Sequence, residues 1–243
     1  MKQTSQKYKA IFFDAGGTLF RPFPSVGGLY ASVASLYGST FEPEKLEIEF
    51  QSAWKRRGGL ASLGAETNEA KERAWWHSLV GEVFRPFGGV RRFEAFFETL
   101  YQSFEKKESW EIFPDVWDTL SYFRENSFVM GIVSNWDLRL ERVLSNLGLM
   151  DRFDFVVGSS ACKSTKPDEK IFREALKRSG TKPSETLYVG DSYEEDFLGA
   201  QAVGIDVFLL DRTGQTNTVP KARRVATLTE LCDFVSKQFQ PAN

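Results

Sequence analysis

Five short apolar runs, each ending at a polar residue or a glycine, constrain the fold of this chain most strongly. The first covers residues 8–13 (YKAIFF) and stops at Asp14. The later runs cover residues 128–133, 153–157, 186–189 and 207–210. A short run that is apolar on both faces is typical of a strand buried in a parallel sheet.

Segments with helical spacing separate these runs, at residues 115–125, 138–147, 168–178, 194–203 and 228–239. Strands that alternate with helices predict an α/β fold, here a Rossmann-like three-layer core around a parallel sheet. Ligands of such sheets bind outside the carboxyl ends of the strands. Asp14 and the polar residues after the other runs are expected at that edge.

One interval breaks the alternation. Residues 20–111 show helical periodicity and no convincing strand, with breaks at residues 38–43, 58–64 and 86–89 that divide them into about four helices. We therefore expect two parts. A core is formed by residues 1–20 and 111–243, and an all-helical cap, residues 21–110, is inserted over the carboxyl edge of the sheet.

Charge and cysteine content exclude several classes of protein. The 243 residues contain 31 Lys and Arg against 33 Asp and Glu, whereas nucleic-acid-binding domains are usually basic. Cys162 and Cys232 match no zinc-ligand spacing, and no run approaches the length of a membrane span. No apolar leader follows the basic N-terminus. We expect a cytoplasmic monomer or homodimer with no nucleic-acid or membrane partner.

Four polar motifs follow the predicted strands in order. Each alone is most simply a turn, a cap or a solvated charge. They are residues 14–18 (DAGGT), Ser134-Asn135, Lys166-Pro167-Asp168, and Gly190-Asp191 with Asp196 shortly after. Taken together, and with the helical insertion, they resemble the haloacid dehalogenase superfamily over residues 8–212.

The resemblance implies a nucleophile and a metal site. Asp14 would attack phosphorus and carry a covalent aspartyl-phosphate. Mg²⁺ would be held by the Asp14 carboxylate, the Gly16 carbonyl and Asp191, with Asp196 orienting Asp191 or a bound water.

The resemblance also implies groups that hold the substrate. Ser134 would donate a hydrogen bond to the phosphate, and Thr18 and Asn135 would bind the substrate. Lys166 would neutralise phosphate charge. Lys163 is a rival for that role, but the family lysine is followed by proline, as Lys166 is.

Gly16 departs from the family pattern. Phosphatases of the family carry there a second Asp, which serves as general acid and base, and such a group is typically worth ~10²–10⁴ in rate. The expected protein is thus a magnesium-dependent, phosphatase-like hydrolase of a small phosphorylated molecule, with weak activity. Glu194, Glu195 and the single histidine, His77, are candidate substitutes.

Three alternatives stay open at this point. The first is a catalytically impaired binding or regulatory protein with the same fold. The second is a metal-independent 2-haloacid dehalogenase, against which Asp191 argues. The third is a phosphonoacetaldehyde hydrolase, which needs a Schiff-base lysine in the cap. Its candidates are Lys45, Lys55 and Lys71. The Trp75-Trp76 pair is interpreted as part of the core of the cap.

Overall fold

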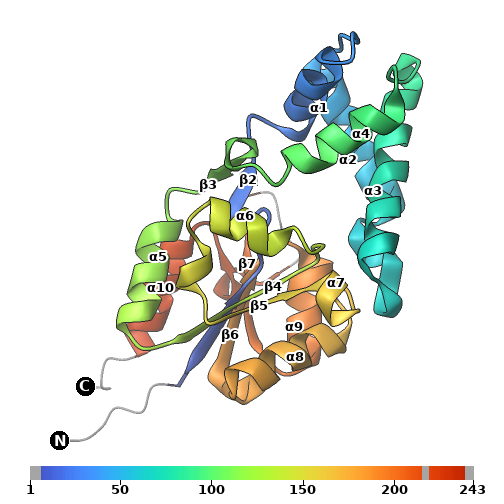
Figure 1. Cartoon of the computed structure of the whole chain (residues 1–243). Coiled ribbons are helices and arrows are strands. Elements are labelled where there is room, and N and C mark those ends of the chain that lie inside the picture. The colour runs from blue at the N-terminus through green and yellow to red at the C-terminus, as the bar shows by residue number, and fades with distance from the viewer. Residues whose placement is uncertain (1–6, 215–218, 239–243) are drawn as a thin grey trace, which may run out of the picture.

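The computed structural model describes residues 7–214 and 219–238. Its main sheet has six strands in the order β5-β4-β1-β6-β7-β8, and every neighbouring pair is parallel (Figure 1). The strands are β1 Ala10–Phe13, β4 Val129–Ser134, β5 Phe155–Gly158, β6 Thr186–Gly190, β7 Asp206–Leu210 and β8 Arg224–Val225. The predicted α/β class is confirmed. The short strand β8 was not predicted.

Helices cover both faces of the sheet (Figure 1). Ile11 and Phe13 of β1 pack in one apolar cluster with the helices on one face of the sheet. Ala10 and Phe12 pack in a second apolar cluster with the helices on the other face. This alternation follows from the two-residue period of a strand. The helices on the side of Ile11 and Phe13 are α5 Val116–Glu125, α6 Leu140–Asn146 and α10 Leu228–Gln238. Those on the side of Ala10 and Phe12 are α8 Glu169–Ser179 and α9 Gly199–Ala202.

The helical insertion forms a separate apolar cluster that includes Tyr30, Val83 and Phe84. Its α-helices match the four that the breaks predict, and they stand beyond the end of the sheet (Figure 1). They are α1 Val26–Ser35, α2 Pro43–Arg57, α3 Glu69–Phe84 and α4 Phe93–Ser103. None of the described helices is both long enough and apolar enough to cross a bilayer.

The prediction of no strand between residues 20 and 111 was wrong at both ends. β2 (Phe20–Pro22) and β3 (Trp110–Ile112) form a two-stranded antiparallel sheet that joins the helical insertion to the core. Three residues are too few to display a two-residue period, and the two strands pair from opposite ends of the insertion. Nothing local therefore marks them as strands.

The predicted helix over residues 194–203 is divided. A π-helical segment, η6 (Tyr193–Leu198), precedes α9, because the Phe197 N–H bonds the Ser192 carbonyl five residues back at 3.1 Å. Single π-turns occur often at functional sites. The segment directs Asp196 into the protein, toward Lys166.

Several short elements complete the fold. They are α7 Ser159–Cys162 and the 3-10 turns η1 Leu60–Glu66, η2 Arg85–Phe87, η3 Lys107–Ser109, η4 Met150–Arg152, η5 Pro183–Glu185 and η7 Lys221–Arg223. The predicted outer ends of the core, residues 1–6 and 239–243, lie outside the described residues, as does Phe239 of the last predicted helix.

Candidate active site

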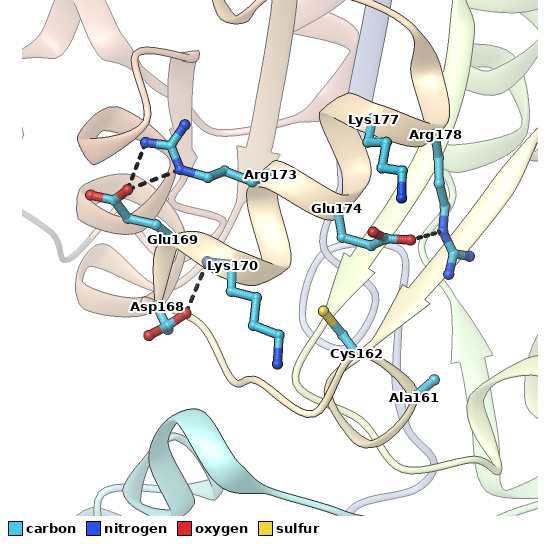
Figure 2. A pocket seen from close by; sticks show the side chains of 9 residues that line it. All are labelled: Ala161, Cys162, Asp168, Glu169, Lys170, Arg173, Glu174, Lys177 and Arg178. Carbon is cyan, nitrogen blue, oxygen red and sulfur yellow. Dashed lines mark hydrogen bonds and ion pairs between the residues drawn. The ribbon is translucent and has the colours of Figure 1, made fainter.

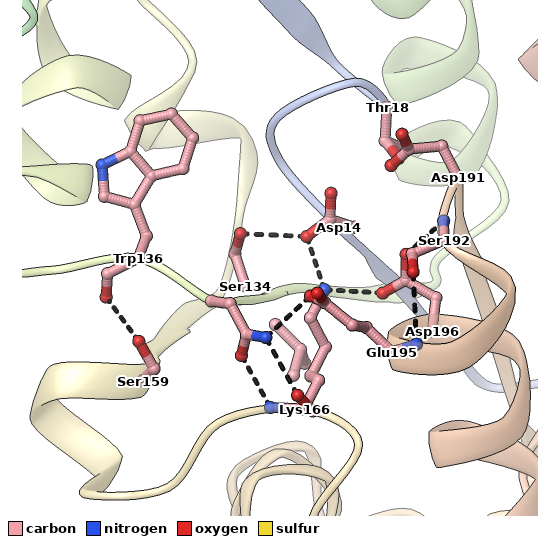
Figure 3. A network of polar contacts seen from close by, with 12 residues as sticks. Asp14, Thr18, Ser134, Trp136, Ser159, Lys166, Asp191, Ser192, Glu195 and Asp196 are labelled. Atoms are coloured by element: carbon pink, nitrogen blue, oxygen red, sulfur yellow. Dashed lines mark hydrogen bonds and ion pairs between the residues drawn. The ribbon is translucent and has the colours of Figure 1, made fainter. Parts of the chain in front are cut away.

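Asp14 directly follows β1, the strand that lies between β4 and β6 in the sheet. Two hydrogen-bond donors hold its side chain. Its Oδ1 accepts hydrogen bonds from Ser134 Oγ at 2.9 Å and from Lys166 Nζ at 2.6 Å. The other carboxylate oxygen points away from both donors (Figure 3). Burial raises the pKa of Asp14, whereas the charge of Lys166 opposes this rise. The carboxylate is thus fixed at one oxygen and open at the other.

Lys166 joins two carboxylates in the interior. Its Nζ lies 2.6 Å from Asp14 Oδ1 and 2.6 Å from Asp196 Oδ1, and only 1% of the residue is exposed. Desolvation alone would lower the pKa of Lys166, but the charges of these carboxylates raise it above its ordinary value. Lys166 is therefore a permanent cation beside Asp14. Lys163 does not line the cavity over Asp14, and its carbonyl accepts a hydrogen bond from Lys170 Nζ.

Tyr188 of β6 is a member of this network that the sequence interpretation missed. Its hydroxyl donates to Asp196 Oδ1 at 2.7 Å and lies 3.2 Å from Lys166 Nζ. A buried tyrosine hydroxyl needs a partner, so a Tyr inside an apolar strand was the available signal.

Asn135 holds the loop that carries Lys166. Its Oδ1 accepts from the Lys166 backbone N–H at 2.6 Å, and its Nδ2 donates to Glu195 Oε2 at 2.7 Å. Asn135 and Glu195 both line the cavity over Asp14. Burial, with Asp196 and Asp14 nearby, raises the pKa of Glu195 to about 7 against the opposing charge of Lys166.

Three carboxylates gather at this edge of the sheet. Asp14, Asp191 and Asp196 each offer an oxygen, and these oxygens lie within 4.8 Å of one another. Both Asp196 oxygens are already hydrogen-bonded, one to Lys166 and Tyr188 and the other to the Ser192 N–H. Asp14 and Asp191 therefore have the oxygens that are free to bind a cation.

The donor set fits a hard divalent cation. Water reaches Asp191, yet desolvation and the charges of Asp14 and Asp196 raise its pKa well above the ordinary value. A cation would relieve this repulsion, and all-oxygen donors suit Mg²⁺. Gly16 lines the same cavity as Asp14 and Asp191.

The loop after β1 is shaped around Asp191. Gly17 has φ of +83°, and a Cβ there would stand 2.4 Å from Asp191 Oδ2, so only glycine fits. Thr18 is fully buried, and its Oγ1 lies 3.4 Å from Asp191 Oδ1 (Figure 3). Thr18 thus lies against Asp191 and is not among the residues that line the cavity.

Gly16 is confined by an aromatic ring. A Cβ on Gly16 would meet Cζ3 of Trp136 at 3.1 Å. The side chain of the usual second Asp would have to share this space with Trp136.

Of the candidate substitutes for the missing acid, Glu195 lines the cavity, whereas Glu194 and His77 do not. His77 lies on α3 and contacts the Glu94 carboxylate at 3.0 Å.

Lys45, Lys55 and Lys71 are exposed and outside the cavity lining, so none is placed to form a Schiff base there.

The cavity over Asp14 has a volume of about 580 Å³ and is lined from both parts of the chain. The core contributes Asp14, Ser134 and Asp191, and the insertion contributes aromatic side chains, among them Trp76. Trp75 is buried in the apolar cluster of the insertion and Trp76 packs against it, as predicted, and Trp76 also lines the cavity.

Glu72 of α3 links the insertion to the core. Its Oε1 accepts from Ser159 Oγ at 2.8 Å and from Thr67 Oγ1 at 2.9 Å, whereas the buried Oε2 has no partner among the described residues. Burial raises the pKa of Glu72 to about 7, although both hydrogen bonds oppose this. The carboxyl is therefore partly protonated near neutral pH.

A second depression, of about 720 Å³, runs along α8 (Figure 2). Its arginines are paired on the same helix, Arg173 with Glu169 at 2.7 Å and Arg178 with Glu174 at 2.9 Å. It shares no lining residue with the cavity over Asp14.

A parallel sheet with an Asp, a Ser, a Lys and a second Asp at its carboxyl edge defines a class of hydrolase. The family described as haloacid dehalogenase-like hydrolase matches residues 8–204, and the chain belongs to that family.

Individual relatives agree with this assignment. The chain is 33% identical to haloacid dehalogenase-like hydrolase domain-containing protein 3 of Mus musculus, over 92% of each chain. It is 28% identical to ribulose-1,5-bisphosphate 5-phosphatase of Halopiger xanaduensis, over 93% of this chain and 99% of that one. Its fold resembles that of the magnesium-bound HAD-hydrolase YfnB of Bacillus subtilis, with a TM-score of 0.77 and 18% identity, over 94% of this chain and 99% of that one.

Proposed function

We propose that this hydrolase is a magnesium-dependent phosphatase that acts on a small phosphorylated molecule through Asp14. The observation that carries the proposal is the asymmetric environment of the Asp14 carboxylate. Ser134 and Lys166 hold Oδ1, and Oδ2 is left open beside Asp191. This arrangement orients one oxygen as a nucleophile.

In the first step, one oxygen of the Asp14 carboxylate forms a bond to phosphorus as the bond from phosphorus to the ester oxygen breaks. The product is an aspartyl-phosphate and an alkoxide that needs a proton. In the second step, water attacks phosphorus, releases inorganic phosphate and regenerates Asp14. Lys166 offsets the repulsion between the Asp14 carboxylate and the anionic phosphate, and Ser134 keeps the carboxylate in place.

Mg²⁺, held by Asp14, Asp191 and the Gly16 carbonyl, would neutralise phosphate charge and polarise the phosphorus centre. Residues 21–110 would act as a cap over a core of residues 1–20 and 111–243, so that the reaction takes place in a cavity with little bulk water. Thr18 would keep Asp191 in position.

Proton transfer is the weak point of this site. Gly16 has no side chain to protonate the leaving oxygen or to activate water. Glu195 is the group on the cavity wall best placed to substitute, because Asn135 holds its carboxylate toward the cavity. We expect slow turnover of alkyl phosphates and faster cleavage of aryl or acyl phosphates, whose leaving groups need no proton.

The test is hydrolysis of p-nitrophenyl phosphate and acetyl phosphate, with Mg²⁺ and with EDTA. Three proteins are compared: the native chain, Asp14→Asn, and Asp118→Asn as an exposed control on α5. The proposal predicts activity that requires Mg²⁺ and disappears only in Asp14→Asn. A native protein inert toward both substrates would favour the binding-protein alternative, and halide release from 2-haloacids in EDTA would favour the dehalogenase.

A further inference from the structure

The part of the cavity beyond Asp14 is walled by aromatic rings that touch in series. The ring centre of Trp136, in the core, lies 5.2 Å from that of Trp110, and the ring centre of Trp110 lies 5.7 Å from that of Phe104. The ring centre of Tyr30 lies 6.3 Å from that of Phe104 and 6.0 Å from that of Phe50. All of these residues line the cavity. A continuous aromatic wall thus leads from Trp136, two residues after Ser134, to Phe50 on helix α2.

Helix α2 adds a carboxylate to this wall. Glu47, Phe50, Gln51 and Trp54 all line the cavity, and their spacing of three, four and seven residues places them on one face of the helix. Glu47 accepts hydrogen bonds from the Gly27 N–H at 2.7 Å and from Gln51 Nε2 at 3.1 Å, which fix the carboxylate without neutralising it.

The negative charge of Glu47 is also near the aromatic wall. Burial raises the pKa of the Tyr30 hydroxyl, Arg139 opposes this rise, and the charge of Glu47 adds to it. Within the part of the chain that the structure describes, no Lys, Arg or His forms an ion pair with Glu47.

The cations on the described cavity wall are already compensated. Arg139 pairs with both oxygens of Asp137, at 2.8 and 2.6 Å, and donates its third nitrogen to the Tyr101 carbonyl at 2.8 Å. Lys166 is shared by Asp14 and Asp196. A second anionic group on the substrate would therefore find Glu47 and no free cation on the wall.

We propose that the substrate is the phosphate monoester of an alcohol that carries an ammonium group, with the ammonium seated against the aromatic wall beside Glu47. This inference rests on the proposed function and adds the chemical class of the leaving group. Aromatic faces attract alkylammonium groups, and a neighbouring carboxylate strengthens the attraction. A cavity of about 580 Å³ has room for such a molecule.

The binding test uses two alcohols of nearly the same shape, choline and 3,3-dimethylbutan-1-ol, which differ in charge and cannot be hydrolysed. Their affinities are measured by tryptophan fluorescence. We expect choline to bind about tenfold more tightly, the size that a cation–aromatic contact supplies. Glu47→Gln should reduce this difference, because the aromatic wall alone then attracts the ammonium group. Glu44→Gln, an exposed change on the same helix, should leave it intact.

The kinetic test compares phosphocholine, 3,3-dimethylbutyl phosphate and 3-phosphonooxypropanoate, with p-nitrophenyl phosphate as a reference. We expect kcat/KM to fall in the order cationic, neutral, anionic, and Glu47→Gln to lower it for phosphocholine but not for the neutral ester.

The two proposals fail in different ways. If p-nitrophenyl phosphate is hydrolysed but choline binds no better than its neutral isostere, or the anionic ester is preferred, the inference about the ammonium group is overturned and the phosphatase stands. If choline is preferred through Glu47 but no phosphate ester is cleaved, the ammonium site stands and the phosphatase proposal fails.

Discussion

The ring of Trp136 stands 3.1 Å from the position that a Cβ on Gly16 would occupy. The backbone of Gly16 is not in the left-handed region, so space and not conformation restricts a side chain there. The absence of the usual second carboxylate is thus matched by a neighbour that fills part of its place. An acid at position 16 requires a small displacement of Trp136.

This relationship predicts that restoring the acid works best when the ring is reduced. Gly16→Asp combined with Trp136→Phe should raise kcat for an alkyl phosphate by about tenfold to hundredfold, because a general acid and base is regained. Gly16→Asp alone should gain less. Steady-state kinetics provide the measurement, and Gly16→Ala with Trp136→Phe is the matched control. An equal gain in that control would show that space, and not proton transfer, limits the native protein.

Glu195 is expected to carry the residual proton transfer. Glu195→Gln keeps the shape of the side chain but cannot transfer a proton, so kcat for an alkyl phosphate should fall by about tenfold or more. For acetyl phosphate the loss in the first half-reaction should be smaller. Glu194→Gln, which lies outside the cavity lining, serves as the control. Equal rates in both variants would remove Glu195 from the mechanism.

The order of motifs made the main site predictable, because parallel strands bring their carboxyl ends to one edge whatever their separation in the chain. In this way the sequence predicted that Asp14, Ser134, Lys166 and Asp191 lie together, and all four line one cavity. Their roles in the reaction stay predictions. Trp136 could not be linked to Gly16, because that contact depends on the conformation of the loop after β4.

Side-chain direction set a second limit on prediction. Thr18 follows Asp14 closely, and the turn at Gly17 brings its hydroxyl to 3.4 Å from Asp191 Oδ1, a contact that the spacing in the sequence does not reveal. Trp75 and Trp76 are adjacent on α3, and neighbouring residues of a helix point in different directions, so one is buried and the other faces the cavity. The pairing of β2 with β3 was invisible because both strands are short.

Lys166 is expected to be a major contributor to stability as well as to activity. Lys166→Met leaves Asp14 and Asp196 buried without their shared cation, which should cost about 3–5 kcal/mol of unfolding free energy. Adding Asp196→Asn should recover part of this loss, since one of the two buried charges is then removed. Urea unfolding in EDTA measures both effects, with Lys177→Met as an exposed control. A double variant less stable than Lys166→Met would contradict this account.

Glu72 predicts a specific dependence of stability on pH. Its pKa is about 7 in the folded protein against 4.5 for an ordinary Glu, so between these pH values the folded state binds more protons than the unfolded state. Stability from this group is therefore present below about pH 4.5 and is lost as pH rises to about 7.

The change Glu72→Gln imitates the protonated form at every pH. Relative to the native chain, its unfolding free energy should rise between pH 4.5 and 7 by up to about 3 kcal/mol, and the difference should then level off. Unfolding in urea across this pH range gives the comparison. A difference that does not vary with pH would mean that Glu72 is ionised throughout.

The covalent step on Asp14 is the central claim, and intact-protein mass spectrometry after brief exposure to acetyl phosphate and Mg²⁺, followed by acid quench, tests it most directly. Because Gly16 cannot help water to attack, the aspartyl-phosphate should accumulate. We predict one added phosphoryl group, mapped to Asp14, which is absent with EDTA and in Asp14→Asn. Phosphate release with no adduct on Asp14, or an adduct that persists in Asp14→Asn, would contradict the account.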